Sequence, residues 1–301
     1  MWGGPTYAWS PDSRTIAVHY VDRRNMRKVP FPHYLGKETI ANNVRRGYPG
    51  DPNEYRTIGF FSVESGNLNL IDLPSPTANR VVGFSWSQSG KLLLDQESDS
   101  ATDRWLYTVD PTDGRLKEIW HDYRGTRIYT SIASAWHSDG KRVVFLSDLN
   151  DRYGLYLLTP GEENPDLLTN ESFDVTSAPL ISVSANRIFF QSNEPSPYER
   201  HVFYVNVEGG ASTRVTSIPG QHRPYPSPNG MRVALLHNSD LRPTELYLMD
   251  TLSELSESQI TNSLNPDFIS LSLVKPRYTT FKSQIDDYTL HARILEPPNL
   301  K

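Results

Sequence analysis

The residue types that could carry out catalysis are scattered along this 301-residue chain in no known catalytic pattern. A serine hydrolase places its nucleophile in a G-x-S-x-G turn, followed along the chain by an acid and a histidine. No such string occurs, and the nearest one, residues 83–87, has Ser87 where the second glycine should stand. The His-Glu-x-x-His, phosphate-loop and dinucleotide-binding glycine patterns are also missing. We therefore predict that this chain alone is inactive and uses no cofactor.

Residues that could bind a metal are equally dispersed. The chain has no cysteine, which excludes disulfides, Cys-zinc sites and thiol nucleophiles, and its eight histidines occur singly. We interpret each histidine as a surface or structural residue. Residues 148–154 resemble the start of a calcium loop, but Thr159 stands where the loop needs a glutamate. The competing interpretation of that segment is a polar turn between two strands, so we predict no metal site.

The charge balance argues against a nucleic-acid partner, because 30 basic residues are outnumbered by 35 acidic ones. A Pro-rich segment at 21–56 is locally basic, with eight Lys or Arg against four acids, and its mixture of charges fits an ordered, solvated loop. No apolar run approaches the ~20 residues that span a bilayer, and no signal-peptide pattern opens the chain. We expect a soluble protein with no membrane partner.

An internal sequence repeat predicts the strands and turns that would position the polar residues described above. An aromatic residue, a polar turn and an apolar run occur together from Trp9, Trp86 and Trp136, and weaker copies begin at Val183 and Tyr225. Asp, Asn or Gly in the turn provides the positive φ of a tight connection, and the apolar run suits a buried strand. Each copy therefore predicts a β-hairpin.

A second type of strand lies between the copies and sets the period. Its tyrosines, Tyr107, Tyr156, Tyr204 and Tyr247, are separated by 49, 48 and 43 residues. A period near ~45 residues with four strands per unit is typical of a β-propeller blade. An irregular β-sandwich is the alternative, although sandwiches do not repeat at a fixed period. We predict an all-β propeller of four-stranded antiparallel blades over residues 1–278, with about five blades and an insertion at 21–56.

Three ordered segments resemble the N-terminal propeller of dipeptidyl peptidase IV-type serine peptidases, of the prolyl oligopeptidase family. They are residues 9–12 (Trp-Ser-Pro-Asp), 48–53 and 192–204. The hairpin predicted at 279–301 is similar to the linker that leads into the α/β-hydrolase domain of that family. The resemblance implies that the chain is an incomplete eight-bladed propeller, and that the hydrolase domain follows in the same polypeptide.

The resemblance implies a noncatalytic, substrate-gating role in a peptidase that releases N-terminal dipeptides from a peptide substrate. It leaves room for a homodimer of the full-length protein. In the family a glutamate pair before the position of Trp9 holds the substrate's amino group, but this chain has Trp-Gly-Gly-Pro there, so no anchor is carried over. Only Tyr129 matches a substrate-lining aromatic, next to Thr130 where the family often has arginine. A core or strand-edge tyrosine is the competing interpretation.

Two other functions remain open at this point. A stand-alone propeller could be a scaffold for proteins or cell-envelope components, and a downstream G-x-S-x-G domain or a stop codon would separate these readings. A propeller enzyme with its own funnel site, such as a glycosidase or lactonase, would need converging carboxylates or metal ligands, and we find none. Beside the resemblance, the missing cysteines favour a bacterial member, in the cytoplasm or periplasm.

Overall fold

The computed structural model describes residues 7–128, 133–169, 172–182, 184, 186–251 and 257–297. These residues form five four-stranded antiparallel sheets, two two-stranded sheets and one short helix, α1 (Pro266–Ile269). The prediction of an all-β chain built from four-stranded antiparallel sheets is thereby confirmed.

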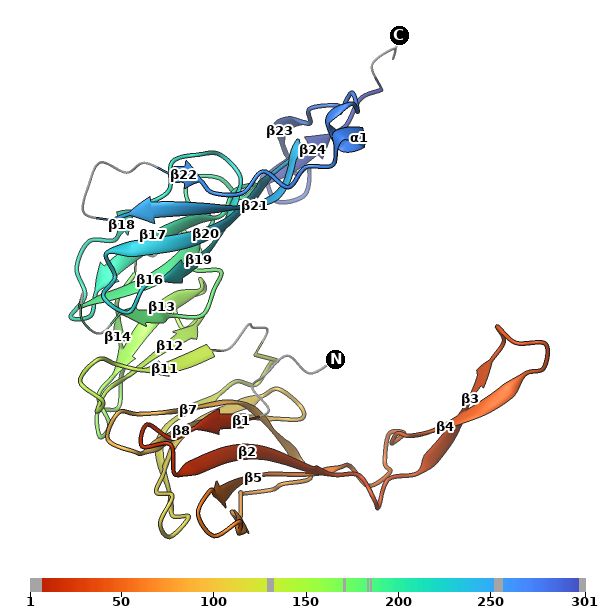
Figure 1. Cartoon of the computed structure of the whole chain (residues 1–301), viewed down its shortest axis with the longest axis vertical. Helices are drawn as coiled ribbons and strands as arrows, with labels where there is room; N and C mark the ends of the chain where they lie inside the picture. Colours follow the sequence, from red (N-terminus) through yellow and green to blue (C-terminus); the bar gives the residue numbers. More distant parts are fainter. Residues whose placement is uncertain are drawn as a thin grey trace. The chain divides into compact units, whose positions relative to one another are not determined.

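Sheets 2 to 5 are each built from four consecutive strands, whereas a hairpin interrupts sheet 1 between its second and third strands (Figure 1). Sheet 1 contains β1 (Tyr7–Trp9), β2 (Thr15–Asp22), β5 (Tyr55–Ser62) and β6 (Leu68–Leu70); sheet 2 contains β7 (Asn79–Trp86), β8 (Leu92–Ser98), β9 (Asp103–Val109) and β10 (Leu116–Tyr123). Sheet 3 contains β11 (Ala133–Trp136), β12 (Val143–Ser147), β13 (Gly154–Leu158) and β14 (Asp166–Leu167). Sheet 4 contains β15 (Leu180–Ser182), β16 (Arg187–Ser192), β17 (His201–Asn206) and β18 (Thr213–Arg214); sheet 5 contains β19 (Gln221–Pro226), β20 (Arg232–Ser239), β21 (Arg242–Asp250) and β22 (Glu257–Gln259).

The turn between the first two strands of each sheet has the backbone that the repeat predicts. The same position has a positive φ in all five copies, namely Ser13 (60°), Gly90 (83°), Gly140 (66°), Asn186 (55°) and Gly230 (62°). Glycine, asparagine and short polar residues adopt this conformation at least cost. The five predicted hairpins are therefore confirmed.

The tryptophans of the repeat connect one sheet to the next. The indole N–H of Trp86 donates to the carbonyl of Ala8 at 3.0 Å, and that of Trp136 donates to the carbonyl of Ser85 at 3.1 Å. In both cases the acceptor is the residue just before the tryptophan of the preceding sheet. The third tryptophan, Trp9, is 52% exposed. The repeat thus specifies the packing between sheets as well as the hairpin within each.

The chain divides into two compact units, Met1–Val143 with Leu158–Pro165, and Val144–Leu157 with Asp166–Lys301. Each has a core of aliphatic and aromatic side chains between successive sheets. In the first unit the core contains Ile58, Phe60, Phe84, Leu92 and Tyr107, among others, from sheets 1 and 2. In the second it contains Phe189, Val202, Val233, Leu235 and Met249, among others, from sheets 4 and 5.

Two hairpins stand apart from the four-stranded sheets. The first, β3 (Lys28–His33) with β4 (Ile40–Arg45), is an arm that projects from sheet 1 between β2 and β5 (Figure 1). Part of the segment 21–56, expected to be an ordered, solvated loop, is thus a regular antiparallel pair in which every residue except Val29 is exposed. The second, β23 (Arg277–Lys282) with β24 (Thr289–Ile294), ends the described chain and belongs to the second unit.

Candidate functional site

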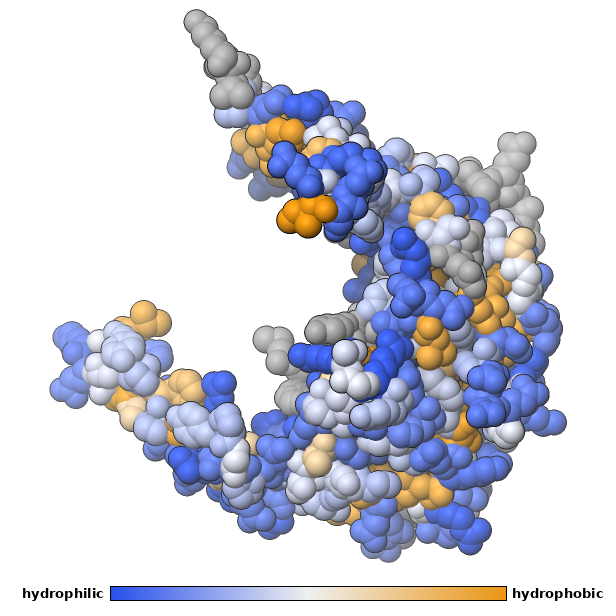
Figure 2. All heavy atoms as spheres, turned by 180° about the vertical axis from the view of Figure 1, so that it is seen from behind, coloured by the Kyte–Doolittle hydropathy of each residue, from blue (hydrophilic) through white to orange (hydrophobic). Residues whose placement is uncertain are grey.

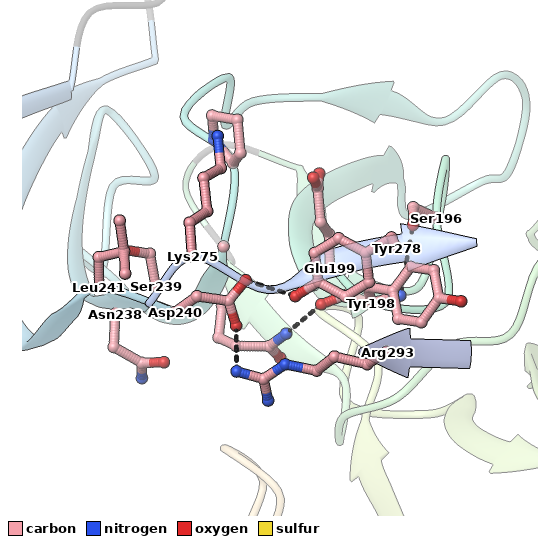
Figure 3. Close-up of a pocket in the computed structure, with 13 residues that line it drawn as sticks. Ser196, Tyr198, Glu199, Asn238, Ser239, Asp240, Leu241, Lys275, Tyr278 and Arg293 are labelled. Carbon is pink, nitrogen blue, oxygen red and sulfur yellow. Dashed lines mark hydrogen bonds and ion pairs between the residues drawn. The ribbon is translucent and has the colours of Figure 1, made fainter. Parts of the chain in front are cut away.

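A cavity of about 880 Å³ lies in the second unit, where the terminal hairpin meets the connecting segments of sheets 4 and 5. Four segments line it: residues 196–199 before β17, residues 219–221 at the start of β19, residues 238–241 at the end of β20 and in the turn to β21, and the segment 275–293 that carries the hairpin. Ten of the thirteen lining residues have a polar or charged side chain. Figure 3 shows its labelled side chains and the bonds between them.

Asp240 joins the turn between β20 and β21 to the hairpin. Its carboxylate accepts a hydrogen bond from the Tyr278 hydroxyl (Figure 3). It also forms an ion pair with Arg293, with Oδ1 and the guanidinium Nη2 2.7 Å apart. Tyr278 is on β23 and Arg293 is its cross-strand partner on β24. The hydrogen bond to Asp240 raises the pKa of Tyr278, which keeps the phenol protonated as a donor. The Asp240 carboxylate therefore bonds to both strands of the hairpin.

Tyr198 forms a second attachment from the segment before β17. Its hydroxyl lies 3.2 Å from the Thr279 carbonyl and 3.1 Å from the Ala292 carbonyl, two residues that face each other across the hairpin. Its ring packs on Tyr278, with ring centroids 4.2 Å apart. We call Tyr198, Asp240, Tyr278 and Arg293 the hairpin latch.

Two charged residues of the cavity take no part in the latch. Lys275 is exposed and, within the part of the chain that the structure describes, has no ion pair; its side chain extends away from Asp240 in Figure 3. Glu199 pairs with His201, with Oε2 and Nε2 2.6 Å apart. The cavity wall therefore carries a free ammonium and a carboxylate that is committed to a buried imidazole.

A row of three buried histidines lies directly behind the cavity wall. The rings of His201 (β17), His222 (β19) and His237 (β20) follow one another with centroids 5.2 and 4.5 Å apart and planes tilted by 31° and 34°. Burial lowers the pKa of both His201 and His237. His237 Nε2 donates to the carbonyl of Pro219, a cavity residue, at 3.2 Å. We call these three residues the histidine row.

Gly220 allows the cavity wall to lie against this row. It has a φ of +141°, and a Cβ there would stand 2.3 Å from the Asn238 carbonyl oxygen and 2.8 Å from His237 Nε2. Any side chain would push the wall away from β20. The backbone of Gly220 also accepts a hydrogen bond from the Arg200 N–H at 2.9 Å, which ties the two connecting segments together.

The other candidate residues of the sequence lie elsewhere or outside the description. Tyr129 and Thr130 lie outside the described residues. Of residues 148–154, the first six form the turn between β12 and β13 and Gly154 begins β13; Asp151 in the turn has a φ of 63°. Among the described residues no group of three or more His, Asp or Glu is arranged to hold a metal ion. Nor is any helix of this part of the chain long and apolar enough to cross a membrane.

Sequence reasoning missed most of this site. Tyr198 and Glu199 lie in the segment that carries the family resemblance, but Asp240, Tyr278 and Arg293 were not singled out. They come from segments about 40 to 95 positions from Tyr198 and share no local motif. Histidines that occur singly in the sequence are brought into a row because β17, β19 and β20 place them at one level of neighbouring sheets.

Comparison with known proteins identifies the fold and the family. The profile described as "Dipeptidyl peptidase IV (DPP IV) N-terminal region" matches residues 4–244. The chain belongs to this family. The dipeptidyl peptidase IV resemblance read from three short segments is confirmed over most of the chain.

Relatives of this dipeptidyl peptidase IV region are longer than the chain. Dipeptidyl-aminopeptidase B of Aspergillus niger is 26% identical over 245 residues, which cover 71% of this chain and 27% of the relative. The crystal structure of Porphyromonas gingivalis dipeptidyl peptidase 4 has a TM-score of 0.81 and 17% identity, and the match covers 98% of this chain and 42% of that one. The chain therefore spans between a quarter and a half of these two proteins, and the latter shares its fold.

Proposed function

We propose that this chain is the noncatalytic propeller region of a serine-type dipeptidyl peptidase, and that it gates substrate access to a hydrolase domain in the same polypeptide. The observation that carries the proposal is the terminal hairpin. In this chain, which belongs to the family, a separate β-hairpin follows the four-stranded sheets and is attached to sheets 4 and 5 by the hairpin latch. The five sheets act as blades, and peptides are the substrate class.

The exposed apolar side chains of the terminal hairpin favour the presence of a domain that covers them. Phe281, Tyr288 and Leu290 are exposed, and Ile285 is 97% exposed. A two-stranded hairpin with such a surface is marginal by itself, and exposed apolar groups of this kind mark interfaces. An α/β-hydrolase domain that continues from the hairpin would bury them.

The test of the noncatalytic role is direct. The purified 301-residue chain, incubated with a chromogenic Xaa-Pro substrate, should release no product above the buffer rate, because it has no G-x-S-x-G nucleophile. The full reading frame should encode such a turn after residue 301 and should cleave the same substrate. Cleavage by the 301-residue chain would contradict the proposal, and a stop codon soon after residue 301 would favour a stand-alone scaffold.

Tyr129 is proposed as part of the substrate wall. The support is the family resemblance, in which the matching position is an aromatic that lines the pocket beyond the amino-terminus anchor. In the full-length enzyme, Tyr129→Ala should raise KM for dipeptide substrates more than it lowers kcat, since the ring contributes binding rather than chemistry. A KM equal to that of the unmodified enzyme would place the tyrosine outside the pocket.

Trp9 supports a propeller with more blades than the five sheets seen here. Trp86 and Trp136 each donate to the sheet before them, whereas Trp9, at the equivalent position of sheet 1, is exposed. We propose that a preceding blade covers it in an eight-bladed propeller. The isolated chain should then self-associate through the sheet edges that an unclosed propeller leaves exposed. A sharp monomer peak in light scattering with a cooperative melt would count against this.

The β3–β4 arm is the proposed contact for a homodimer of the full-length protein. The arm has no core of its own, and it exposes Phe31, Tyr34, Ile40 and Val44, with Leu35 91% exposed. Figure 2 shows hydrophobic residues along it. Replacing residues 28–45 by a short Gly-Ser connection in the full-length protein should convert a dimer to a monomer in light scattering, while an unchanged mass would exclude the arm as the contact.

A further inference from the structure

His222 and Glu257 face each other in the interior of the second unit, directly behind the cavity wall. Their side chains are 0% and 1% exposed, and His222 Nε2 lies 3.5 Å from Glu257 Oε2. Neither atom has a hydrogen-bond partner among the described residues. His222 Nδ1 lies 3.0 Å from the Arg200 carbonyl, which can only accept, so Nδ1 carries the proton of the neutral ring. The Nε2 lone pair of that ring therefore points at a carboxylate oxygen.

Two buried acceptors that face each other without a proton are unfavourable. Each forgoes the hydrogen bonds that it had to water, a cost of about 1–3 kcal/mol per group and more for a charged one. A single proton on Nε2 converts the contact into a charge-assisted hydrogen bond between an imidazolium and a carboxylate. The geometry therefore favours proton uptake at this contact.

The groups around the pair limit uptake to one proton. The titratable or charged side chains that face the histidine row are Glu199 ahead of β17, His201 on β17, Arg214 on β18, His237 on β20, Arg242, Glu245 and Tyr247 on β21, and Glu257 on β22. Burial lowers the pKa of His201 and His237, and a positive His222 lowers both further. Glu199 is committed to His201 and Glu245 to Thr261 and Ser263, so Glu257 is the carboxylate left for His222.

The other carboxylate oxygen of Glu257 connects this pair to the cavity. Oε1 accepts hydrogen bonds from the backbone N–H groups of Ser217 and Ile218. The next two residues are Pro219 and Gly220, which line the cavity. Fixing the Glu257 carboxylate by a proton on His222 would therefore also fix the segment 217–220.

We propose that His222 and Glu257 form a buried proton-binding pair that, when it holds a proton, fastens residues 217–220 to sheet 5. The pair is a regulatory device of the fold: the wall of the cavity next to the hairpin latch is held more firmly when the pair holds a proton. It does not depend on the peptidase assignment.

A double-mutant cycle measures the pair. His222→Gln, Glu257→Gln and the double variant are unfolded in urea at about pH 8 and about pH 5.5, which bracket the range in which an ordinary histidine titrates. The effect of the double variant on the unfolding equilibrium constant is compared with the product of the two single effects. The two should differ by less than about threefold at the higher pH, and by about tenfold or more at the lower pH. A coupling that stays constant or shrinks on acidification overturns the proposal.

His19→Gln is the matched control. His19 Nε2 is also buried without a hydrogen-bond partner among the described residues, but burial, its largest influence, lowers the pKa of His19. The loss of unfolding free energy caused by His19→Gln should therefore shrink as the pH falls, because the variant removes a ring that resists protonation. The cost of His222→Gln should grow. The same sign for both variants contradicts a proton-binding role for His222.

Hydrogen exchange keeps the test decisive if a variant does not fold. In the unmodified chain, the Ser217 and Ile218 amides, corrected for intrinsic exchange rates, should be protected several-fold more at about pH 5.5 than at about pH 8. The amides of β8, which belongs to the first unit, supply the reference. Protection at residues 217 and 218 that falls in parallel with β8 overturns the proposal.

Discussion

At the scale of single residues, three tryptophans at equivalent positions have unequal surroundings. Trp86 donates to the Ala8 carbonyl and its ring lies 5.5 Å from that of Phe60, whereas Trp9 is exposed and, in the described part of the chain, donates to no acceptor. An indole that bonds a carbonyl of the neighbouring sheet contributes to stability twice, because its removal also leaves that carbonyl without a donor.

Trp86→Phe should therefore destabilise the chain by about 1–2 kcal/mol, and Trp9→Phe by less than about 0.5 kcal/mol. Urea unfolding followed by far-UV circular dichroism measures both. Equal losses for the two variants would show that the bond to Ala8 contributes nothing beyond the apolar contact of the ring.

At the scale of elements, the terminal hairpin depends on the latch for its attachment to the sheets. Tyr198 and Asp240 reach it from two connecting segments of the second unit. The hairpin's own surface ion pair, Arg277 with Glu296, is exposed and contributes little. Local opening of the hairpin is thus controlled by one carboxylate and one phenol rather than by a core.

Asp240→Asn should speed amide exchange in β23 and β24 about tenfold, because it removes the ion pair with Arg293 and weakens the bond from Tyr278. Exchange in β20 should stay the same. Glu296→Gln is the control and should change neither. Exchange in the hairpin that does not respond to Asp240→Asn would mean that apolar contacts hold it.

At the scale of the whole molecule, buried histidines in both units make stability depend on pH. Burial is the largest influence on His19, His201 and His237 and lowers the pKa of each. The fold therefore holds these rings neutral, while the unfolded chain protonates them near pH ~6.5. Their contribution is complete above that pH and is lost as the pH falls below it.

The urea midpoint should accordingly be lower at about pH 5.5 than at about pH 8. His201→Gln should reduce that difference, although it also loses the hydrogen bonds to Glu199 and Thr216 and so lowers stability at both pH values. A midpoint that is unchanged or higher in acid would mean that proton uptake elsewhere outweighs these three rings.

The sequence by itself determined the all-β class, the five hairpins, their positive-φ turn positions and the family. Each of these is a local pattern: Trp, turn and apolar run lie within about ten residues of one another, and their repetition at one period reveals the architecture. The tryptophans that connect sheets 1, 2 and 3 were visible as part of the same repeat.

Only the tertiary structure decided the hairpin latch and the histidine row. Asp240 lies between β20 and β21, whereas Tyr278 and Arg293 lie on the two strands of the terminal hairpin. His201, His222 and His237 appear in the sequence as isolated residues. Hydrogen bonds and ion pairs act over a few ångströms in space, and distance along the chain does not report such contacts. The repeat fixes which strands form; the packing of sheets 4 and 5 and the return of the hairpin fix which polar side chains meet.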